Sequence, residues 1–237
     1  MNKVALITGV SREMGLGYET ARQLKELGFK VLIAARDLHK VSELAEKIDV
    51  SARQLDITND QSVNQLAKDV ETEFGKLDVL INNAAAYFDQ GRQALNADIL
   101  FIKEAIDTNL LGAWRMIKAF QWLLQKSDSG RVVNVSSGAG SFTDPIFGLE
   151  NHQGNTPVYA ITKLALNGLT VKLARELKDT KVTVNSVCPG FVATYLGTEQ
   201  WGARPVSEGA QGIVWAATLP DPSPTGKFFR DGVQVSW

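Results

Sequence analysis

The 237-residue sequence contains one cysteine, Cys188, so no disulfide can form within the chain. A lack of disulfides is typical of proteins from reducing compartments, and we expect a cytoplasmic protein. The sequence also lacks long hydrophobic runs near its start. The apolar stretch at residues 4–7 is too short for a signal sequence or a membrane span, and we expect no membrane association.

Net charge is nearly absent as well. Lysine and arginine total 25 and aspartate and glutamate 26, with no block of like charges. Nucleic-acid and membrane-surface binding depend on concentrated basic patches, so we expect neither and predict a small-molecule partner instead. Pro/Ser-rich linkers, internal repeats and low-complexity segments are also missing. The sequence therefore predicts a single domain over residues 1–237.

Predicted strands and helices alternate at short intervals along the chain. Runs of β-branched residues without polar alternation, such as residues 4–7, are typical of strands buried on both faces of a parallel sheet. The order predicts an α/β fold, a Rossmann-type doubly wound parallel sheet of about seven strands with helices on both faces and a ligand at the carboxyl ends of the strands. The strands are expected at 4–7, 30–35, 52–55, 77–81, 131–135, 181–187 and 226–235, and the helices at 18–27, 38–48, 60–74, 96–124, 157–173 and 206–218.

A glycine-rich turn follows the first predicted strand. Gly9, Gly15 and Gly17 lie between that strand and the next helix. Such a turn lets a phosphate approach the backbone, and the helix N-terminus offers unpaired N–H groups to the anion. An ordinary glycine-rich turn is the alternative.

Tyr159 and Lys163 are four residues apart near the start of a predicted helix, which places both side chains on one face. A nearby cation favours the phenolate, so the proton of Tyr159 becomes available nearer neutral pH. Such a tyrosine can donate a proton to a carbonyl oxygen or accept one from an alcohol. A solvated surface pair has the same spacing, and the rest of the chain must decide between the two interpretations.

Polar residues occur at several other informative places. Ser137 closes the fifth strand, where a hydroxyl could also start a turn. Asn109 lies inside a predicted helix, although asparagine is unfavourable there because its side chain competes for backbone partners. His152, in a loop insert at about 138–157, has no evident carboxylate partner and is more readily a bystander than a catalytic base.

Together these features resemble the short-chain dehydrogenase/reductase family over essentially the whole chain. The insert at 138–157 and the C-terminal stretch ending in Trp237 are similar to the carbonyl reductase branch. Two departures stand out: five residues separate Gly9 from Gly15, where the family usually has three, and Ala85 replaces a glycine. The matching motifs are Thr8-Gly9, Gly15-Leu16-Gly17, Asp56, Asn82-Asn83-Ala84, Asn109, Ser137, Tyr159, Lys163, Pro189-Gly190 and Thr194.

The resemblance implies an NADP-dependent oxidoreductase that reduces a ketone or aldehyde by hydride transfer, without a metal. It implies that Tyr159 is the general acid and that Lys163 lowers its pKa and binds the nicotinamide ribose. Ser137 would hydrogen-bond the substrate oxygen, and Asn109 would hold a water that links Lys163 to solvent. Cofactor contacts, besides Tyr159 and Lys163, are expected from Gly9, Ser11, Arg12, Gly15, Leu16, Gly17, Arg36, Asp56, Ile57, Asn83, Ala84, Pro189, Gly190, Val192 and Thr194.

The end of the second strand bears on cofactor choice. Asp37 lies 20 positions after Gly17, and an acidic residue at that distance usually accepts the ribose 2′-hydroxyl of NAD. In the family, however, the NAD-selecting carboxylate ends the strand itself, where this chain has Ala35. Arg36 and Arg12 could instead clamp the 2′-phosphate of NADP(H), which we expect as the cofactor. A surface salt bridge of Arg36 with a neighbour such as Asp37 is the alternative.

Aromatic residues flank the expected substrate site. Phe142 and Phe147 lie in the insert, and Tyr195 and Trp201 lie in a predicted substrate lid at about 195–205. They favour an apolar pocket for aromatic or bulky carbonyl compounds, although such residues also serve as ordinary packing.

Three further alternatives stay open. The chain could be a non-catalytic NADP(H)-binding sensor or scaffold on the same fold. It could also act on acyl-carrier-bound β-keto esters, or on a sugar-like or steroid alcohol; for a carrier protein the lid offers a single cation, Arg204. By resemblance we expect a homo-oligomer, a dimer or tetramer, although the branch includes monomers with a much longer insert.

Overall fold

The computed structural model describes residues 3–86, 89, 91, 93–151 and 156–237. It contains one eight-stranded sheet with the strand order β3-β2-β1-β4-β5-β6-β7-β8, in which β1 to β7 are parallel and β8 pairs antiparallel with β7. The strands are β1 (Val4–Thr8), β2 (Lys30–Ala35), β3 (Ser51–Gln54), β4 (Val79–Asn82), β5 (Gly130–Val135), β6 (Val182–Val187), β7 (Phe228–Arg230) and β8 (Val233–Gln234). The order turns back at β1 and β4, and the predicted doubly wound sheet is confirmed.

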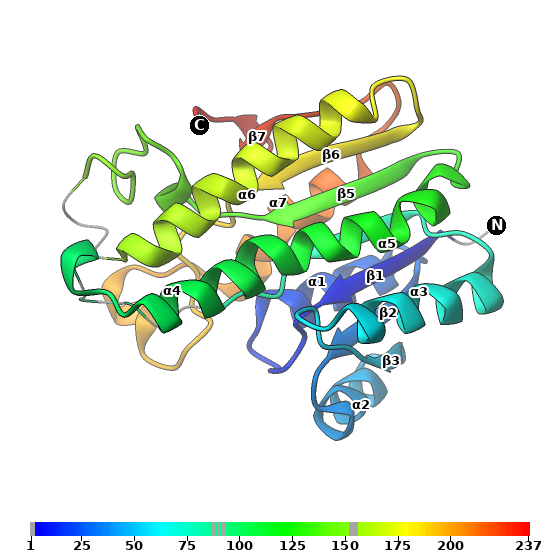
Figure 1. The fold of residues 1–237 in the computed structure, drawn as a ribbon. Helices are drawn as coiled ribbons and strands as arrows, with labels where there is room; N and C mark the ends of the chain where they lie inside the picture. Colours follow the sequence, from blue (N-terminus) through cyan, green and yellow to red (C-terminus); the bar gives the residue numbers. More distant parts are fainter. Residues whose placement is uncertain (1–2, 87–88, 90, 92, 152–155) are drawn as a thin grey trace.

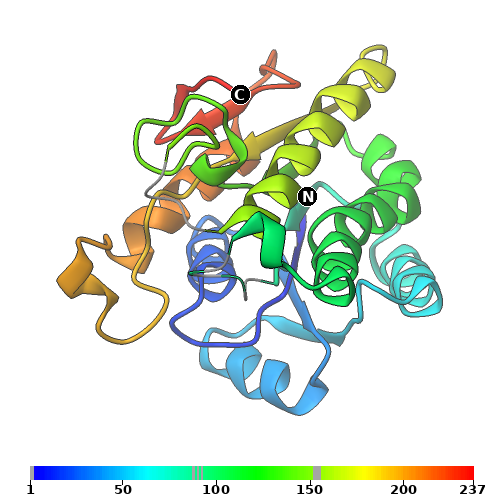
Figure 2. The ribbon, with the colours of Figure 1, turned by 60° about the vertical axis from the view of Figure 1, so that its left-hand side comes forward.

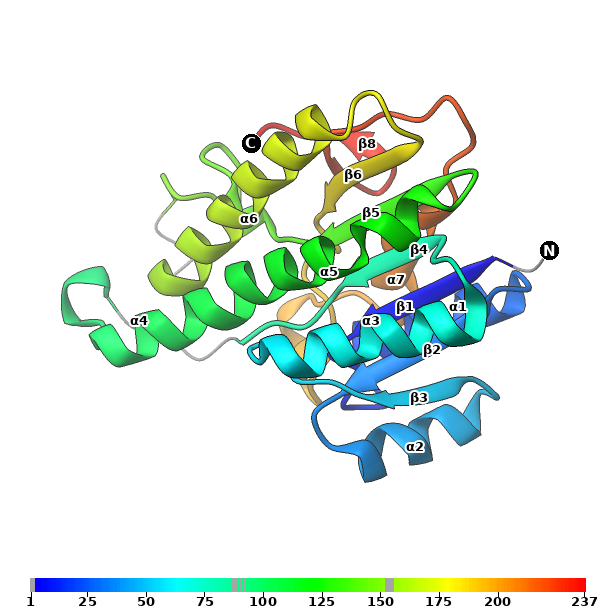
Figure 3. The ribbon, with the colours of Figure 1, turned by 45° about the vertical axis from the view of Figure 1, so that its right-hand side comes forward.

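Helices cover both faces of the sheet (Figures 1 and 3). One layer contains α1 (Leu16–Glu26), α2 (Leu38–Lys47) and α7 (Val206–Thr218). The other contains α3 (Asp60–Phe74), α5 (Ala113–Gln125) and α6 (Pro157–Glu176). Each layer buries its own apolar core against the sheet, so all five residues of β1 are buried from both sides.

Helix α3 illustrates how the sequence specifies these elements. Val63, Leu66 and Val70 are buried at helical spacing and face the sheet. Asn59 caps its N-terminus by accepting hydrogen bonds from two backbone N–H groups, and Gly75 ends it with φ +70.

Two predicted elements differ in detail. The helical region expected at 96–124 consists of α4 (Ile99–Ile106), a π-helical turn η2 (Asp107–Gly112) and α5. The last strand, expected at 226–235, is split into β7 and β8. Asp231 and Gly232 have φ of +52 and +75, and two residues with positive φ in succession close a tight hairpin.

The long loops gather at the carboxyl edge of the sheet. The arrowheads of β1, β5 and β6 point to that edge (Figure 1), and Figure 2 shows the blue turn after β1, the yellow-green segment after β5 and the orange segment after β6 around it. Short 3-10 turns occur there at η1 (Ala94–Asn96), η3 (Gly138–Gly140) and η4 (Thr198–Trp201). A doubly wound sheet binds its ligand at this edge.

Within the described ranges, the structure has no helix with both the length and the apolar character needed to cross a membrane. The same residues contain no cluster of three or more His, Cys, Asp or Glu side chains that could hold a metal ion.

Candidate active site

The ends of β1 and β4 are joined by hydrogen bonds. Thr8 Oγ1 accepts from the backbone N–H groups of Asn83 and Ala84, both at 3.1 Å, and Asn83 Nδ2 donates to Thr8 O at 2.8 Å. Gly9 follows with φ +72, and a Cβ there would lie 2.5 Å from Ala84 Cα. Only glycine fits this close approach, which explains why the sequence has one here.

The glycine-rich turn leads directly into α1. Gly15 is the N-cap residue and donates its N–H to Arg12 O at 3.1 Å, closing the five-residue loop. No side chain caps the start of α1. A Cβ on Gly17 would lie 2.6 Å from Asn83 Nδ2, so the helix start packs closely on the loop after β4. A narrow, uncapped helix N-terminus of this kind fits the phosphates of a dinucleotide.

Helix α6 carries Tyr159 and Lys163. It begins with Pro157, which suits the first helical position because no N–H is needed there. Its cap comes from a distant residue: Asp89 Oδ2 accepts from Val158 N at 2.6 Å and from Tyr159 N at 3.4 Å. Asp89 is 1% exposed and therefore fixes the turn that carries the tyrosine.

Lys163 is buried beside the tyrosine. Its side chain is 2% exposed, and Nζ donates to Val135 O, at the end of β5, at 2.7 Å. Nζ lies 5.5 Å from the centre of the Tyr159 ring. Burial lowers the pKa of Lys163 to about 8, although nearby Cys188 acts in the opposite direction. The ammonium form is therefore still the main species at neutral pH.

Asn109 is explained by its contacts. It is 1% exposed in the π-helical turn η2. Its Oδ1 accepts from Ala86 N at 2.7 Å, and its Nδ2 donates to Ala86 O and to Thr162 Oγ1, both at 3.0 Å. Thr162 precedes Lys163, so Asn109 joins α6 to the loop after β4. Single π-turns within helices are frequent at functional sites.

Ser137 lies just beyond β5, one residue before η3. It is the N-cap of this turn, and its Oγ accepts from Ala139 N at 3.2 Å. The structure therefore brings Ser137, Tyr159 and Lys163 to the same end of β5, because Lys163 bonds the carbonyl of Val135 two residues before the serine.

The end of β2 leaves an arginine unpaired. Ala35 is the last strand residue and Arg36 is exposed. Asp37 caps α2 by accepting from Lys40 N at 3.2 Å, and Arg36 forms no ion pair within the described part of the chain. The alternative salt bridge between Arg36 and Asp37 is therefore not formed. Past β3, Asp56 holds its own loop by accepting from the Thr58 hydroxyl at 2.7 Å.

Arg12, which is predicted to bind the 2′-phosphate together with Arg36, has other contacts in the structure. The guanidinium of Arg12 lies 4.1 Å from the centre of the Tyr195 ring, and Nη1 donates to Thr194 O at 3.4 Å. The glycine-rich loop thus touches the predicted lid, and the clamp formed by Arg12 and Arg36 stays a prediction. The remaining expected cofactor residues lie on loops at the carboxyl edge: exposed Ser11, buried Ile57, Pro189, Gly190 (φ +78) and Val192, which is bridged to Arg204.

The aromatic residues of the expected substrate site are only partly brought together. Phe147 packs on Phe191, with ring centres 6.1 Å apart, whereas Tyr195 stacks on the glycine-rich loop. Phe142 is 50% and Trp201 72% exposed. Their role in substrate binding stays a prediction, and His152 lies outside the described residues.

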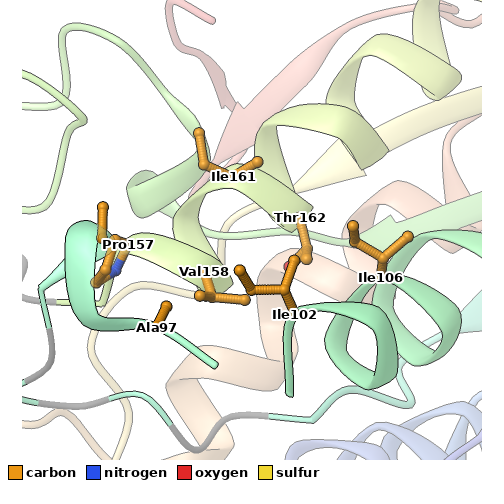
Figure 4. A pocket seen from close by; sticks show the side chains of 8 residues that line it. Ala97, Ile102, Ile106, Pro157, Val158, Ile161 and Thr162 are labelled. Atoms are coloured by element: carbon orange, nitrogen blue, oxygen red, sulfur yellow. The ribbon is translucent and has the colours of Figure 1, made fainter. Parts of the chain in front are cut away.

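A cavity of about 160 Å³ lies between η1, α4 and the start of α6 (Figure 4). Ile102 and Ile106 of α4 face Val158 and Ile161 of α6 across it. Thr162, three residues after Tyr159, also lines the cavity and accepts a hydrogen bond from Asn109, so the cavity adjoins the site at the strand ends.

Comparison with known proteins decides the family. A family model described as short chain dehydrogenase matches residues 3–204, most of the chain. The chain belongs to the short-chain dehydrogenase family. The resemblance inferred from the motifs is confirmed.

Relatives within the short-chain dehydrogenase family include reductases and dehydrogenases. A (+)-neomenthol dehydrogenase from Arabidopsis thaliana is 32% identical over 96% of this chain and 95% of that protein. A 3-oxoacyl-[acyl-carrier-protein] reductase from Synechocystis sp. is 35% identical over 86% of this chain and 79% of that protein. Among solved structures, ElxO with NADP bound has a TM-score of 0.83 and 26% identity over 97% of both chains. Salutaridine reductase from Papaver somniferum has a TM-score of 0.80 and 27% identity over 97% of this chain and all of that one.

Sequence reasoning missed several residues that shape this short-chain dehydrogenase site. Asp89 carries no local motif, and its partner Val158 is 69 positions away. Asp144 and Arg230 form an ion pair across 86 positions behind Ser137. Only the folded chain reveals such pairs, although a carboxylate in the glycine-rich insert was a weak signal that it holds the loop.

Proposed function

We propose that this chain is an NADPH-dependent reductase that converts a ketone or aldehyde carbonyl to an alcohol, and catalyses the reverse oxidation. One observation carries the proposal. The buried Lys163 donates from Nζ to Val135 O at 2.7 Å, two residues before Ser137 in the sequence, and Nζ lies 5.5 Å from the centre of the Tyr159 ring. A solvated surface pair would not be 2% exposed at its lysine.

The residues of the carboxyl edge fit a dinucleotide. The close-packed turn at Gly9, Gly15 and Gly17 and the uncapped start of α1 would hold its phosphates. The exposed, unpaired Arg36 beside the small Ala35 favours a 2′-phosphate, and ElxO, a structural relative, was solved with NADP bound. When bound, the reduced nicotinamide supplies the hydride that reaches the carbonyl carbon.

The protein supplies the proton and the charge. The Tyr159 hydroxyl donates its proton to the carbonyl oxygen, and the Lys163 ammonium stabilises the phenolate that remains. Ser137 donates a hydrogen bond to the same oxygen and orients it. Asn109 supports this arrangement by joining α6, through Thr162, to the loop after β4, through Ala86.

The lid favours a small apolar substrate over a carrier-bound one. The guanidinium of Arg204 donates to Pro189 O and pairs with Asp231 at 2.8 Å, so it is not free to attract an acidic carrier protein. Phe147 and Phe191 instead offer apolar surface. The neomenthol dehydrogenase relative supports an alicyclic or aromatic ketone.

Reduction of a 3-oxoacyl group is the second candidate, because a 3-oxoacyl-[acyl-carrier-protein] reductase is 35% identical. The non-catalytic sensor is disfavoured, because a binding module does not need Ser137, Tyr159 and Lys163 at one strand end. A cytoplasmic location and a homo-oligomeric state stay predictions.

The test measures, by absorbance, how fast NADPH or NADH is oxidised in the presence of a carbonyl compound. The compounds are aryl and alicyclic ketones, aldehydes, diketones and β-keto esters. Tyr159→Phe should lower kcat by about 10²- to 10⁴-fold while NADPH binding is unchanged. Tyr18→Phe is the matched control, because this tyrosine of α1 is outside the predicted site. Retained turnover in Tyr159→Phe contradicts the mechanism. Tight NADPH binding without turnover on any compound favours the sensor.

A further inference from the structure

An ion pair with a buried carboxylate lies beside Gly138, the residue after the predicted catalytic serine. Arg230, the last residue of β7, donates from Nη2 to Asp144 Oδ2 in the loop insert. The carboxylate side chain is 6% exposed and the arginine side chain 25%. Arg230 also donates to Cys188 Sγ, from Nε at 3.3 Å and from Nη2 at 3.2 Å. The pair therefore connects the C-terminal strand, the insert and the end of β6.

This ion pair touches the backbone next to Ser137. A Cβ built on Gly138 would lie 2.5 Å from both Arg230 Nη2 and Asp144 Oδ2. The Gly138 N–H donates to Cys188 Sγ at 3.1 Å. The residue after the serine is thus enclosed by the guanidinium, the carboxylate and the thiol, and any movement of the pair moves the serine backbone.

The same carboxylate folds the insert. Asp144 Oδ1 accepts from the backbone N–H groups of Ile146 at 3.0 Å and Phe147 at 2.8 Å. Burial raises the pKa of Asp144, but these hydrogen bonds and the one from Arg230 outweigh burial and leave the pKa below its usual value. The ionised carboxylate therefore holds the turn that places Phe147 against Phe191.

Cys188, which accepts hydrogen bonds from Arg230, connects the ion pair to the loop that is expected to bind the nicotinamide. Cys188 Sγ also accepts from Gly190 N at 3.4 Å, in the loop where Pro189-Gly190 is expected to contact the cofactor. The C-terminal tail closes the arrangement, because Phe142 N donates to Trp237 O at 3.1 Å and Ser141 Oγ donates to Ser236 O at 3.1 Å. Arg230 is thus linked to the insert through Asp144, and through Cys188 to Gly138, which follows the serine, and to Gly190 of the expected cofactor loop.

We propose that Arg230 and Asp144 are positioning residues: their ion pair sets the backbone at Ser137 and the orientation of Phe147, and so determines how a carbonyl substrate is aligned. The inference rests on the proposed function for its effect on turnover. Neither side chain contacts the residues expected to bind the adenosine half of the cofactor, so binding of that half should not depend on the pair. A misplacement of about 1 Å at a reacting group costs on the order of 10²-fold in rate.

The experiment compares Arg230→Gln with Arg131→Gln. Arg131 is also a buried arginine of the sheet, 2% exposed, and pairs with Asp221 at 2.5 Å, but it lies near the opposite end of β5. Each variant loses an ion pair with one buried partner, Asp144 in the first pair and Arg131 in the second, and both variants should lose stability. Arg230→Gln should lower kcat/KM for the best ketone by about 10- to 100-fold, whereas Arg131→Gln should leave kcat/KM within about two-fold.

Two more variants separate positioning from general destabilisation. Asp144→Asn keeps the shape and two backbone hydrogen bonds and should give a smaller loss than Arg230→Gln. The double variant should lose about as much as Arg230→Gln alone, because the two residues act as one unit. Additive losses, or equal losses in Arg230→Gln and Arg131→Gln, overturn the inference. If Arg230→Gln fails to fold, Asp144→Asn carries the same comparison.

Hydrogen–deuterium exchange gives a readout that does not need turnover. The amides of residues 138–149 should exchange faster in Arg230→Gln and Asp144→Asn than in Arg131→Gln and the unchanged protein. If the unchanged protein reduces no carbonyl compound, the proposed function fails and exchange alone decides this inference. Unchanged exchange at 138–149 overturns it in either case.

Discussion

The catalytic helix and the cofactor loops lie at the same edge of the sheet but are held differently. Lys163 and Asn109 are 2% and 1% exposed, and each bonds to a separate element. Arg36 and Arg12, which are expected to select the cofactor, are exposed side chains on turns. The residues proposed for proton transfer are thus fixed by packing, whereas the arginines proposed to bind phosphate are exposed.

This difference separates two kinds of effect. A change at α6 alters a buried charge and should act on rate and on the pH dependence of stability. A change at an exposed arginine should act on cofactor choice with little effect on folding. Glycines of the turn lie between these cases, because their backbone shape is both structural and functional.

The largest effect is expected at Lys163. Lys163→Met should lower kcat/KM by about 10³-fold, because the ammonium that favours ionisation of Tyr159 is lost. The same variant should be no less stable than the unchanged protein at neutral pH, because burial of this charge disfavours folding. Steady-state kinetics and urea unfolding check both statements.

The pH dependence sharpens this prediction. The pKa of Lys163 is about 8 in the folded protein and 10.5 when exposed. Between these values the unfolded chain holds more protons, so the free energy of unfolding of the unchanged protein gains up to about 3 kcal/mol from this group as pH rises. Lys163→Met should lack that gain, and Lys172→Met, on the exposed side of α6, should keep it. If the free energy of unfolding depends on pH in the same way in all three proteins, the prediction that Lys163 carries a buried charge is contradicted.

The next largest effect is expected at Gly9. Gly9→Ala places a Cβ on a backbone with φ +72 and 2.5 Å from Ala84 Cα, whereas Gly28→Ala places a Cβ on a backbone with φ +84 and with nothing within 4 Å. The backbone conformation alone costs about 1–2 kcal/mol, and overpacking adds about 1–3 kcal/mol at Gly9. Urea unfolding of both variants, with NADPH titration, checks the difference. Equal losses of stability mean that the contact with Ala84 is not what requires glycine.

Much of the fold could be predicted because its signals are local. Buried β-branched runs located the parallel strands, and helical spacing placed Tyr159 and Lys163 on one face. The hairpin at Asp231 was missed although the sequence carries its signal, because Asp231-Gly232 between two strand-like stretches is typical of a two-residue hairpin with positive φ values. Backbone turns of this kind override strand propensity.

The site was predictable only where a motif marks it. Asn109 was conspicuous as a helix-interior asparagine, but its partner Ala86 followed from the fold. Asp89 and the pair of Asp144 with Arg230 act across distances of 69 and 86 positions, and nothing in their neighbours distinguishes them from ordinary surface charges. Long-range pairs between charged residues carry no periodic signal.

The smallest effect is expected at Arg36. A change at this residue tests the exposed side chains of the comparison, whereas the changes at Lys163 test the buried ones. Arg36→Ala should reduce the preference for NADPH over NADH by about 10- to 100-fold, because charge-assisted hydrogen bonds contribute about 1.5–3 kcal/mol. Stability and the Kd for NADH should not change, since the side chain is exposed and unpaired. Lys40→Ala, which removes a nearby exposed cation that pairs with Asp37, should leave the preference intact. If Lys40→Ala matches Arg36→Ala, general positive charge attracts the phosphate; if neither variant matters while Arg12→Ala does, the glycine-rich loop selects the cofactor and must release Tyr195 to do so.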